Sequence, residues 1–435
     1  MAKTDASPRN DTPVYCAHYV ERKKRRCKLT PVKHSTYCAE HAAHHTDSAL
    51  SDHIPCPLDP AHFISRSKLE HHLKVCNAKN YDYSSHSYYK ENVNVVPAHE
   101  IRELKREPLA KLPVQDLISI CLELLKYGPE SRLCEVKSTD RVSDQDMDQY
   151  RPLFQVGTNV GSSALRHATQ QVALVNTLAQ FQESNSTDTT FPETCFVELG
   201  AGSGKLSQWF HFKVNDSFFV LVDKQMCRRK ADSYFKKQKC NFIRLKMDIK
   251  DIDVSGVPEI GDYKRVCFAC KHLCGGATDL ALVSAAQTAE QKETTVLIAL
   301  CCHHLCSWEL YTGKDYFLKH FKPEQFYILS SLSAWATCFK QESMQIGDKD
   351  VLNNAVLKFQ NDPESFILQG HLVLDKSVQW YIGRCAKTVL NDGRAHFMIK
   401  KGFMVQFSKY VDVSVSPENT ALLCYKSTAS SNERL

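Results

Sequence analysis

Short apolar runs alternate with amphipathic stretches along the second half of the chain. Each run has the length of a buried strand and ends at a polar or glycine-containing turn, as strands of a parallel sheet do. The runs predict strands at Cys195–Leu199, Phe218–Val222, Asn241–Met247, Arg265–Ala269 and Thr295–Leu300. Later patterns predict a helix and two closing strands at Ser377–Leu390, Gly402–Tyr410 and Thr420–Tyr425. Together they indicate an α/β fold with a doubly wound sheet.

The region before these strands is predicted to be largely helical. Apolar residues recur at helical spacing in Val114–Tyr127 and in Ser163–Phe181, whereas Ser138–Arg151 is polar and is expected to be a mobile connection. Asn80–Pro97 has the character of a linker that carries four tyrosines, Tyr81, Tyr83, Tyr88 and Tyr89. These rings could stack on bases, but we favour the alternative that they fasten the linker to the next domain.

Composition narrows the class of protein. The chain has 435 residues and a net charge of +6, which suits a nucleic-acid partner without requiring one. Met1–Thr12 lacks the apolar core of a signal peptide, and apolar runs such as Val296–Cys302 are far shorter than the roughly 20 residues of a membrane span. We therefore expect an intracellular protein of the nucleus and/or cytoplasm, with no membrane association. Its 19 cysteines should be thiols or metal ligands.

Residues 13–45 carry a spacing of three cysteines and one histidine that predicts a first zinc site at Cys16, Cys27, Cys38 and His41. The segment is too short for a hydrophobic core, so metal binding would supply the folding free energy. Three other histidines are competing ligands: His34, His44 and His45. The cationic strip Glu21–Arg26 lies between two of the ligands. It could hold phosphates, or it could be a nuclear-localisation-like tract or a solvated face.

Residues 53–78 predict a second zinc site, with ligands Cys56, His62, His72 and Cys76. Ser67–Val75 has helical character, and His72 and Cys76 are four residues apart, so both can point to one ion. His71 is the neighbouring competitor. The spacing resembles the CHHC zinc finger of RNA-processing proteins.

A glycine-rich turn follows the first predicted strand of the sheet. Glu198 lies near the end of the strand, Gly200, Gly202 and Gly204 form the turn, and a helix can begin at Lys205. Such a turn lets backbone N–H groups approach a nucleotide-type ligand, and Asp223 lies where nucleotide-binding folds place a ribose-binding acid. A tight turn without a ligand is the alternative.

The turn resembles motif I of class I (Rossmann-like) S-adenosylmethionine (SAM) methyltransferases. The resemblance implies that Glu198 and the glycines hold the methionine end of SAM and that Asp223 holds its ribose. It also implies that Asp248, after the third strand, holds the adenine amino group; a surface-turn aspartate is the alternative.

Two cysteine-rich runs, Cys267–Gly276 and Cys301–Cys306, follow the fourth and fifth strands and would face one crevice if the strands are neighbours. Cys267, Cys270, Cys301 and Cys302 could bind a third metal ion. We favour the alternative that the cysteines pack as small apolar residues, because methyl transfer from a sulfonium needs no metal.

The order of motifs resembles the tRNA:m4X modification enzymes. The resemblance extends from Cys16 to Cys424 and includes Lys271–Asp279, Cys301–His304 and Ser416–Asn419. It implies a SAM-dependent 2′-O-methyltransferase that modifies nucleotide 4 of the tRNA acceptor stem, with zinc fingers aiding tRNA recognition. We expect a monomer with a linker and helical segment at residues 79–160 and a methyltransferase domain at residues 161–426.

The acceptor hydroxyl needs a base or a nearby cation. Lys271 is the first candidate for contacting it, with a phosphate anchor or a solvated lysine as the alternative role, and His272 and His303 are weaker candidates. Two other functions stay open. One is a methyltransferase for DNA or protein, which the absence of an N/D-P-P-Y tetrad disfavours for nitrogen acceptors; the other is a non-enzymatic RNA-processing adaptor with a vestigial fold.

Overall fold

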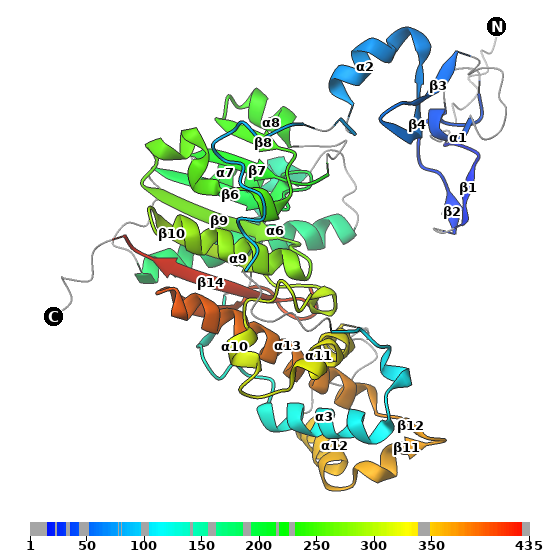
Figure 1. Ribbon diagram of the computed structural model, residues 1–435, viewed down its shortest axis with the longest axis vertical. Coiled ribbons are helices and arrows are strands. Elements are labelled where there is room, and N and C mark those ends of the chain that lie inside the picture. Colours follow the sequence, from blue (N-terminus) through cyan, green and yellow to red (C-terminus); the bar gives the residue numbers. More distant parts are fainter. Residues whose placement is uncertain are drawn as a thin grey trace, which may run out of the picture. The chain divides into compact units, whose positions relative to one another are not determined.

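The computed structural model describes residues 15–21, 24–31, 35–42, 52–76, 78–79, 81–96, 104–139, 142–154, 162–185, 193–214, 217–225, 231–337 and 349–428. The chain forms two compact units, Met1–Asp82 and Tyr83–Leu435. The described residues of the first unit form two small antiparallel hairpins and two α-helices (Figure 1). Their bounds are β1 Tyr19–Val20, β2 Arg25–Arg26, α1 Ala39–Ala42, β3 His53–Cys56, β4 Asp59–Ser65 and α2 Leu69–Val75.

The second unit is built on a sheet with the strand order β5-β13-β14-β10-β9-β6-β7-β8. The strands are β5 Val136–Ser138, β6 Thr194–Leu199, β7 Phe218–Val222, β8 Phe242–Leu245, β9 Arg265–Lys271, β10 Glu293–Ala299, β13 Met404–Lys409 and β14 Thr420–Lys426. β14 is antiparallel to its two neighbours, and the other pairs are parallel. In this order β7 and β8 lie on one side of β6, and β9, which comes next in the sequence, lies on the other side of β6. The crevice at the carboxyl ends of β6 and β9 is therefore the switch point where α/β sheets bind ligands.

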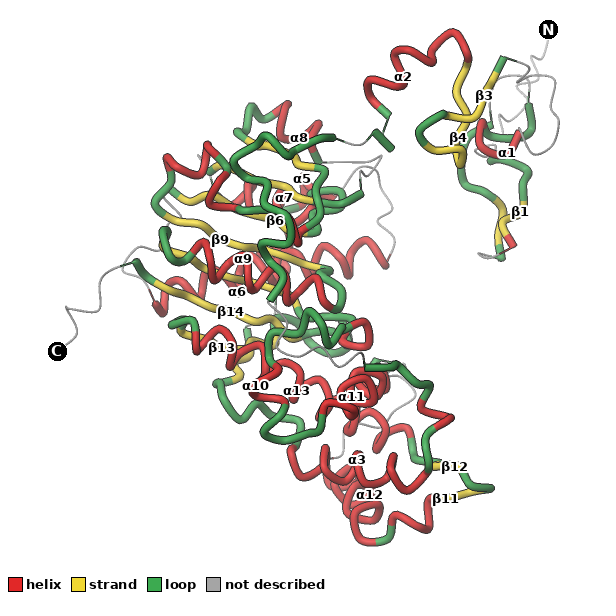
Figure 2. The backbone as a smooth tube through the Cα atoms, in the orientation of Figure 1, coloured by secondary structure: helices red, strands yellow, loops and turns green. Residues whose placement is uncertain are grey.

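Helices cover both faces of this sheet (Figure 2). One face packs on α6 Ser162–Asn185, α7 Lys205–Lys213 and α8 Asp232–Lys237, and the other on α9 Gly276–Thr288 and the end of α13 Lys376–Lys400. Side chains of β6 alternate between the faces: Val197 packs toward α9, and Phe196 packs toward α6 and α7. Because both faces are covered, the central strands are apolar throughout, which is why they could be recognised as runs.

A helical layer extends beyond the β5 side of the sheet, and α13 runs from the sheet into it (Figure 1). The layer has its own apolar core. It contains α3 Val114–Tyr127, α10 Lys314–Phe317, α11 Phe326–Leu332, α12 Lys349–Asn361 and the hairpin of β11 Ile367–Leu368 with β12 His371–Leu372. No helix among the described residues is long and apolar enough to cross a membrane.

The described part of Ser138–Arg151 is not only a connection, so that expectation was wrong. β5 ends at Ser138 and pairs with β13, α4 Asp144–Gln149 follows, and α5 Arg151–Phe154 begins at Arg151. The Ser143 hydroxyl accepts from the Asp146 N–H, and the Asp146 carboxylate accepts from the Ser143 N–H. This capping box satisfies N–H groups at the helix start, which lets a polar segment form a helix.

The tyrosine-bearing linker contacts the sheet domain. Tyr83, Tyr88 and Tyr89 pack against its core, and Tyr89 forms a β-bridge with Ile252. The prediction that tyrosines fasten this linker to the next domain is therefore confirmed for these three rings.

Candidate active site and metal centres

A cleft of about 820 Å³ opens at the switch point of the sheet. It is lined by the glycine turn after β6, the start of α7, the end of β9 and the first turns of α6. Its size lies within the range of small-molecule sites. The sequence-predicted residues Glu198, Gly200, Gly202, Lys271 and His272 all line it.

The glycine turn has a backbone that other residues rarely adopt. Gly200, Gly202 and Gly204 have φ angles of +66°, +49° and +76°. A Cβ atom at Gly202 would meet nothing within 4 Å, so the space beside this residue is open to the cleft it lines. At Gly202 a ligand can therefore approach the backbone closely, without a side chain in the way.

Glu198, the second-to-last residue of β6, carries a buried carboxylate. Its Oε2 accepts hydrogen bonds from the Ser207 N–H at 3.0 Å and from the Ser207 hydroxyl at 2.5 Å. Burial raises the pKa of Glu198 to about 7, although the two hydrogen bonds from Ser207 oppose the rise. The cleft therefore contains a carboxylate that a cationic ligand would help to ionise.

Asp223 and Asp248 follow β7 and β8 and do not line this cleft. Asp223 accepts from the Gly202 N–H at 2.7 Å, so it supports the glycine turn. Asp248 pairs with Lys224 at 2.9 Å. Burial would raise the pKa of Asp248, but the hydrogen bonds from Lys224 and the Lys250 N–H outweigh it and lower the pKa. Carboxylate oxygens have two lone pairs, so these bonds leave both residues able to accept from a nucleoside.

Lys271 is the last residue of β9 and is 5% exposed. Its Nζ has no hydrogen-bond partner among the described residues. Burial lowers the pKa of Lys271 to about 8, and Cys301 and Glu198 oppose the decrease. A buried amine without a partner in a cleft is costly for the fold, and such groups concentrate at functional sites.

The first turns of α6 supply cleft residues that we did not predict. Ser163, His167 and Gln171 line the cleft and are spaced by four residues, so they share one helix face. This spacing, on the helix just before the first strand of the sheet, was the signal that could have found them.

His272, which follows β9 with a φ of +67°, has an exposed side chain at the cleft.

The ligand atoms of the second zinc module lie close together. Cys56 and Cys76 Sγ are 3.7 Å apart, His62 and His72 Nε2 are 3.1 Å apart, and His72 Nε2 is 3.1 Å from Cys56 Sγ. A tetrahedral zinc site has ligand separations of about 3.3 to 3.8 Å, given its bond lengths. Asp59 Oδ2 lies 3.2 Å from His62 Nδ1, the kind of contact that orients a metal-binding imidazole. The four residues therefore fit one zinc ion.

The first module brings Cys16, Cys27, Cys38 and His41 together in the same way, with all four ligand atoms within 4.8 Å of one another. His41 Nδ1 is 3.5 Å from Cys16 Sγ and 3.3 Å from Cys38 Sγ. The competitors His34, His44 and His45, and Arg22 and Lys23 of the cationic strip, lie outside the described residues.

The remaining cysteines separate into two groups. Cys267 and Cys270 lie within β9 and are packed in the two cores on either side of the sheet. For these two residues the structure agrees with packing as small apolar side chains. Cys301 and Cys302 instead lie beside Cys274, and the three sulfurs are within 4.8 Å of one another.

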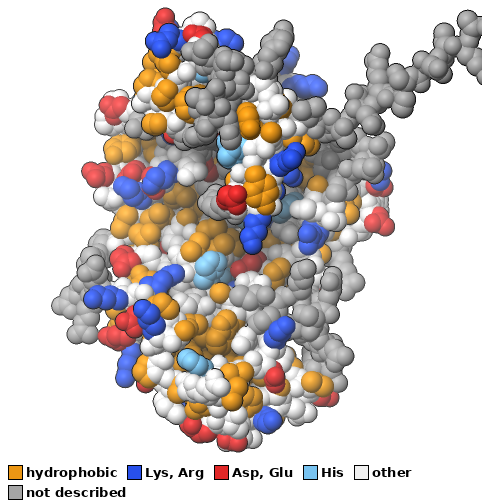
Figure 3. All heavy atoms as spheres, turned by 90° about the vertical axis from the view of Figure 1, so that its right-hand side faces the viewer, with side chains coloured by type: hydrophobic (Ala, Val, Ile, Leu, Met, Phe, Trp, Pro, Cys, Tyr) orange, Lys and Arg blue, Asp and Glu red, His pale blue; other side chains and the backbone are white. Residues whose placement is uncertain are grey.

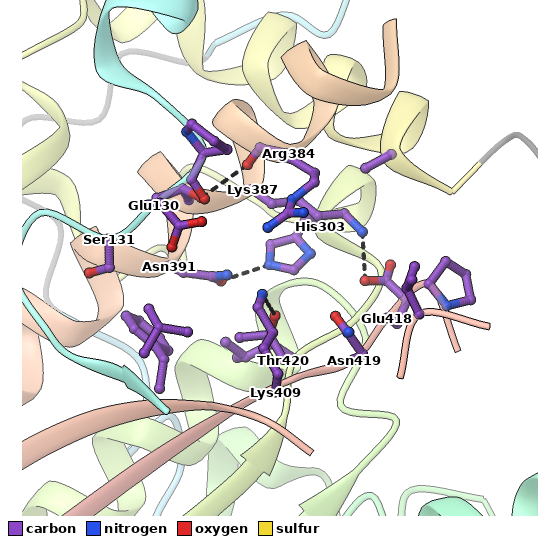
Figure 4. Close-up of a pocket in the computed structure, with 18 of the residues that line it drawn as sticks. Glu130, Ser131, His303, Arg384, Lys387, Asn391, Lys409, Glu418, Asn419 and Thr420 are labelled. Carbon is purple, nitrogen blue, oxygen red and sulfur yellow. Dashed lines mark hydrogen bonds and ion pairs between the residues drawn. The ribbon is translucent and has the colours of Figure 1, made fainter. Parts of the chain in front are cut away.

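A second pocket, of about 620 Å³, lies between α13, β13 and the loop before β14 (Figure 4). His303 Nε2 lies 2.7 Å from Asn391 Oδ1, and Lys387 pairs with Glu418 at 2.6 Å. Glu418 belongs to the Ser416–Asn419 motif, so the structure brings this motif and Cys301–His304 to one pocket.

On the face in Figure 3, basic side chains are spread among acidic and apolar ones rather than gathered in one patch.

The strand order and the glycine turn define this protein as a SAM-dependent methyltransferase with a class I fold, as the sequence predicted. The chain belongs to the family described as Methyltransferase TRM13, whose family model matches residues 169–425. Two further models match the modules of the first unit: "CCCH zinc finger in TRM13 protein" at residues 14–42 and "U11-48K-like CHHC zinc finger" at residues 54–77. The predicted family and the two zinc fingers are therefore confirmed.

Two of the similar proteins match nearly the whole chain, and a third matches about two thirds of it. The Homo sapiens "tRNA:m(4)X modification enzyme TRM13 homolog" is 28% identical and covers 96% of both chains. The Saccharomyces cerevisiae "tRNA:m(4)X modification enzyme TRM13" is 26% identical, over 94% of this chain and 96% of the relative. The Dictyostelium discoideum homolog is 32% identical over 65% of this chain and 55% of the relative.

Proposed function

We propose that this protein transfers the methyl group of SAM to the 2′-hydroxyl of nucleotide 4 in the acceptor stem of tRNA. The names of its relatives support the substrate. The observation that carries the chemistry is the unpartnered Lys271 amine, which lines the same cleft as the glycine turn. A tRNA substrate also fits an intracellular site of action, in the nucleus and/or cytoplasm.

The residues of the cleft suit the parts of SAM. The Glu198 carboxylate would face the cationic methionine end, together with the backbone of Gly200, Gly202 and Gly204. The N–H groups of Gly202 and Gly204 already donate to Asp223 and to the Ala201 carbonyl, so these two glycines would contribute a close approach of the backbone rather than free donors. Asp223 would accept from the ribose hydroxyls, and Asp248 from the adenine amino group. SAM, when bound, supplies an electrophilic methyl group, so the chain has to align the acceptor and remove one proton.

Lys271 is the catalytic group in this proposal. Its amine would contact the acceptor 2′-oxygen. With a pKa of about 8, roughly a tenth of the amine is neutral at pH 7 and can accept the hydroxyl proton. His272 is a second candidate for a catalytic role, because it follows Lys271 and also lines the cleft. We further propose that the protein acts as a monomer.

The two fingers would bind tRNA around the acceptor stem. A-form RNA hides its base edges in a deep groove, so recognition has to use phosphates, 2′-hydroxyls and shape. The described part of the cationic strip includes Arg25 and Arg26, both exposed, on the hairpin strand β2 of the first finger. It is suited to phosphate contact, and the zinc ligands hold that hairpin in place.

Ribose-methylation mapping tests this proposal. tRNA from cells with and without the protein would be compared, and we expect the 2′-O-methyl group at nucleotide 4 to be lost in the cells that lack it. Loss of a methyl group elsewhere in RNA would indicate another acceptor. No change in RNA, together with no shift in melting temperature on adding SAM to the purified protein, would favour the non-enzymatic adaptor.

A further inference from the structure

Three cysteine thiols meet where the chain leaves β9 and β10. Cys274 lies in the loop after β9, and Cys301 and Cys302 lie in the loop after β10. Cys274 is exposed, Cys302 is half-buried and Cys301 is buried. Among the described residues, only three groups of three or more His, Cys, Asp or Glu residues bring their ligand atoms within 4.8 Å of one another. Two of these groups are the zinc fingers, and the third is this cysteine cluster.

We propose that Cys274, Cys301 and Cys302 bind a third zinc ion, in the catalytic domain. Cys274 Sγ and Cys302 Sγ are 3.3 Å apart, close to the roughly 3.8 Å expected for two thiolates on one tetrahedral zinc ion. Three thiolates form a soft ligand set that selects zinc over magnesium or calcium. Because the Cys274 side of the cluster is exposed, water completes the fourth position.

The backbone holds the two loops in place to present these thiols. A Cβ atom at Gly275 would lie 2.1 Å from the carbonyl oxygen of Leu305, so the loop after β9 packs directly on the loop after β10. Cys302 has a φ of +51°, in the left-handed region that non-glycine residues rarely adopt. A conformation of this kind persists only where the surroundings fix it, and such positions concentrate at functional sites.

The neighbouring cysteines do not share this arrangement. Cys267 and Cys270 lie in the cores on the two faces of the sheet, and Cys306 lies 3.2 Å from Arg394 Nη2. The cluster is therefore not a consequence of high cysteine content in this part of the chain. A zinc ion here would join the loop that begins after Lys271 to the loop that carries His303, and so fix the end of β9 at the active-site cleft. The proposal does not depend on which molecule accepts the methyl group.

Metal content of the full-length protein tests the site. After dialysis against zinc and removal of unbound ion, elemental analysis should give three zinc ions per chain. Cys274→Ser and Cys302→Ser should each give two, and the control Cys240→Ser should give three, because Cys240 lies outside the cluster. Two zinc ions in the unchanged protein, or three in both cluster variants, would overturn the proposal.

Cobalt substitution gives a second measurement that reports the ligands directly. Thiolate-to-cobalt charge-transfer absorption should correspond to eight thiolates, five from the fingers and three from the cluster, and should decrease in Cys274→Ser. Absorption that corresponds to five thiolates would contradict the site. So would a mass two hydrogens lower, from a Cys274–Cys302 disulfide that persists in the zinc-loaded protein. Thermal unfolding of each variant checks that the catalytic domain is folded.

Discussion

The Arg394 guanidinium donates to the Asp279 carboxylate at 2.7 Å, and both side chains are completely buried. Asp279 lies in the first turn of α9 and Arg394 in α13, so the pair joins a helix on the sheet to the helix that enters the helical layer. Arg394 also donates to the carbonyl of Gly275, and Thr312 donates to Asp279. The acid of the Lys271–Asp279 motif therefore fixes the structure behind the cleft rather than contacting a ligand in it.

Asp279→Ala should destabilise the catalytic domain strongly. It would leave the Arg394 charge buried without its partner, which costs about 3 to 5 kcal/mol in other proteins. Asp315→Asn is the matched control, because its pair with Lys400 at 2.7 Å is exposed and should contribute at most about 1 kcal/mol. Denaturant unfolding of both variants measures the difference. Equal losses would mean that the buried pair has no special role.

Lys271→Met should retain SAM and tRNA binding and lose turnover. General-base catalysis contributes about 10² to 10⁴ in rate, so kcat should decrease by that factor with KM nearly unchanged. In the unchanged protein kcat should rise with pH until about pH 8 and then level off, following the pKa of Lys271. Lys264→Met, which removes an exposed lysine paired with Glu193, is the control. A Lys271→Met enzyme with full kcat would remove Lys271 from the chemistry.

The same substitution should make the ligand-free protein more stable. The pKa of Lys271 is lowered to about 8 in the folded state, so the unfolded chain binds more protons between about pH 8 and pH 10.5. Folded stability therefore increases with pH across this window, and the full penalty applies below pH 8. At pH 7, Lys271→Met should gain on the order of 3 kcal/mol, and the gain should shrink by pH 10. A constant gain at both pH values would show that the amine is not responsible.

SAM affinity should increase with pH up to about 7. Burial raises the pKa of Glu198 to about 7 in the free protein, and a cationic ligand favours the ionised carboxylate, so binding releases a proton below that pH. Each pH unit can change the affinity by up to about tenfold. Isothermal titration calorimetry at pH 5.5 to 8 should show this dependence, and Glu198→Gln should abolish it. Equal affinities at pH 6 and pH 8 would argue against contact between Glu198 and the charged end of SAM.

Neutralising the described part of the cationic strip should reduce the salt dependence of tRNA binding. The slope of log affinity against log salt changes by up to about 0.9 for each duplex phosphate contact. Replacing Lys24, Arg25 and Arg26 by Gln should lower the slope accordingly while SAM affinity stays the same. The control is a triple substitution by Gln of three exposed lysines elsewhere, Lys126, Lys264 and Lys319. An unchanged slope would place the phosphate contacts on another part of the protein.

Local signals in the sequence were enough for much of this fold. β7 and α3 have the predicted bounds because a buried run and an amphipathic repeat each end at a clear turn. Contacts distant in sequence had no such signal. The pairing of β5 with β13, the bond from Ser207 to Glu198 and the approach of Cys274 to Cys302 depend on how the loops pack in three dimensions. α13 extends to Lys400, beyond its predicted end, because its final turns find apolar partners on the sheet.

Methyl transfer to a defined hydroxyl tests the central claim most directly. Purified protein would be incubated with methyl-labelled SAM and two tRNAs that differ only in a single 2′-deoxy substitution at nucleotide 4. The account predicts one labelled 2′-O-methyl group at nucleotide 4 of the unmodified tRNA and none in the deoxy tRNA. Equal labelling of both tRNAs, or no labelling by protein that binds SAM and tRNA, would contradict it.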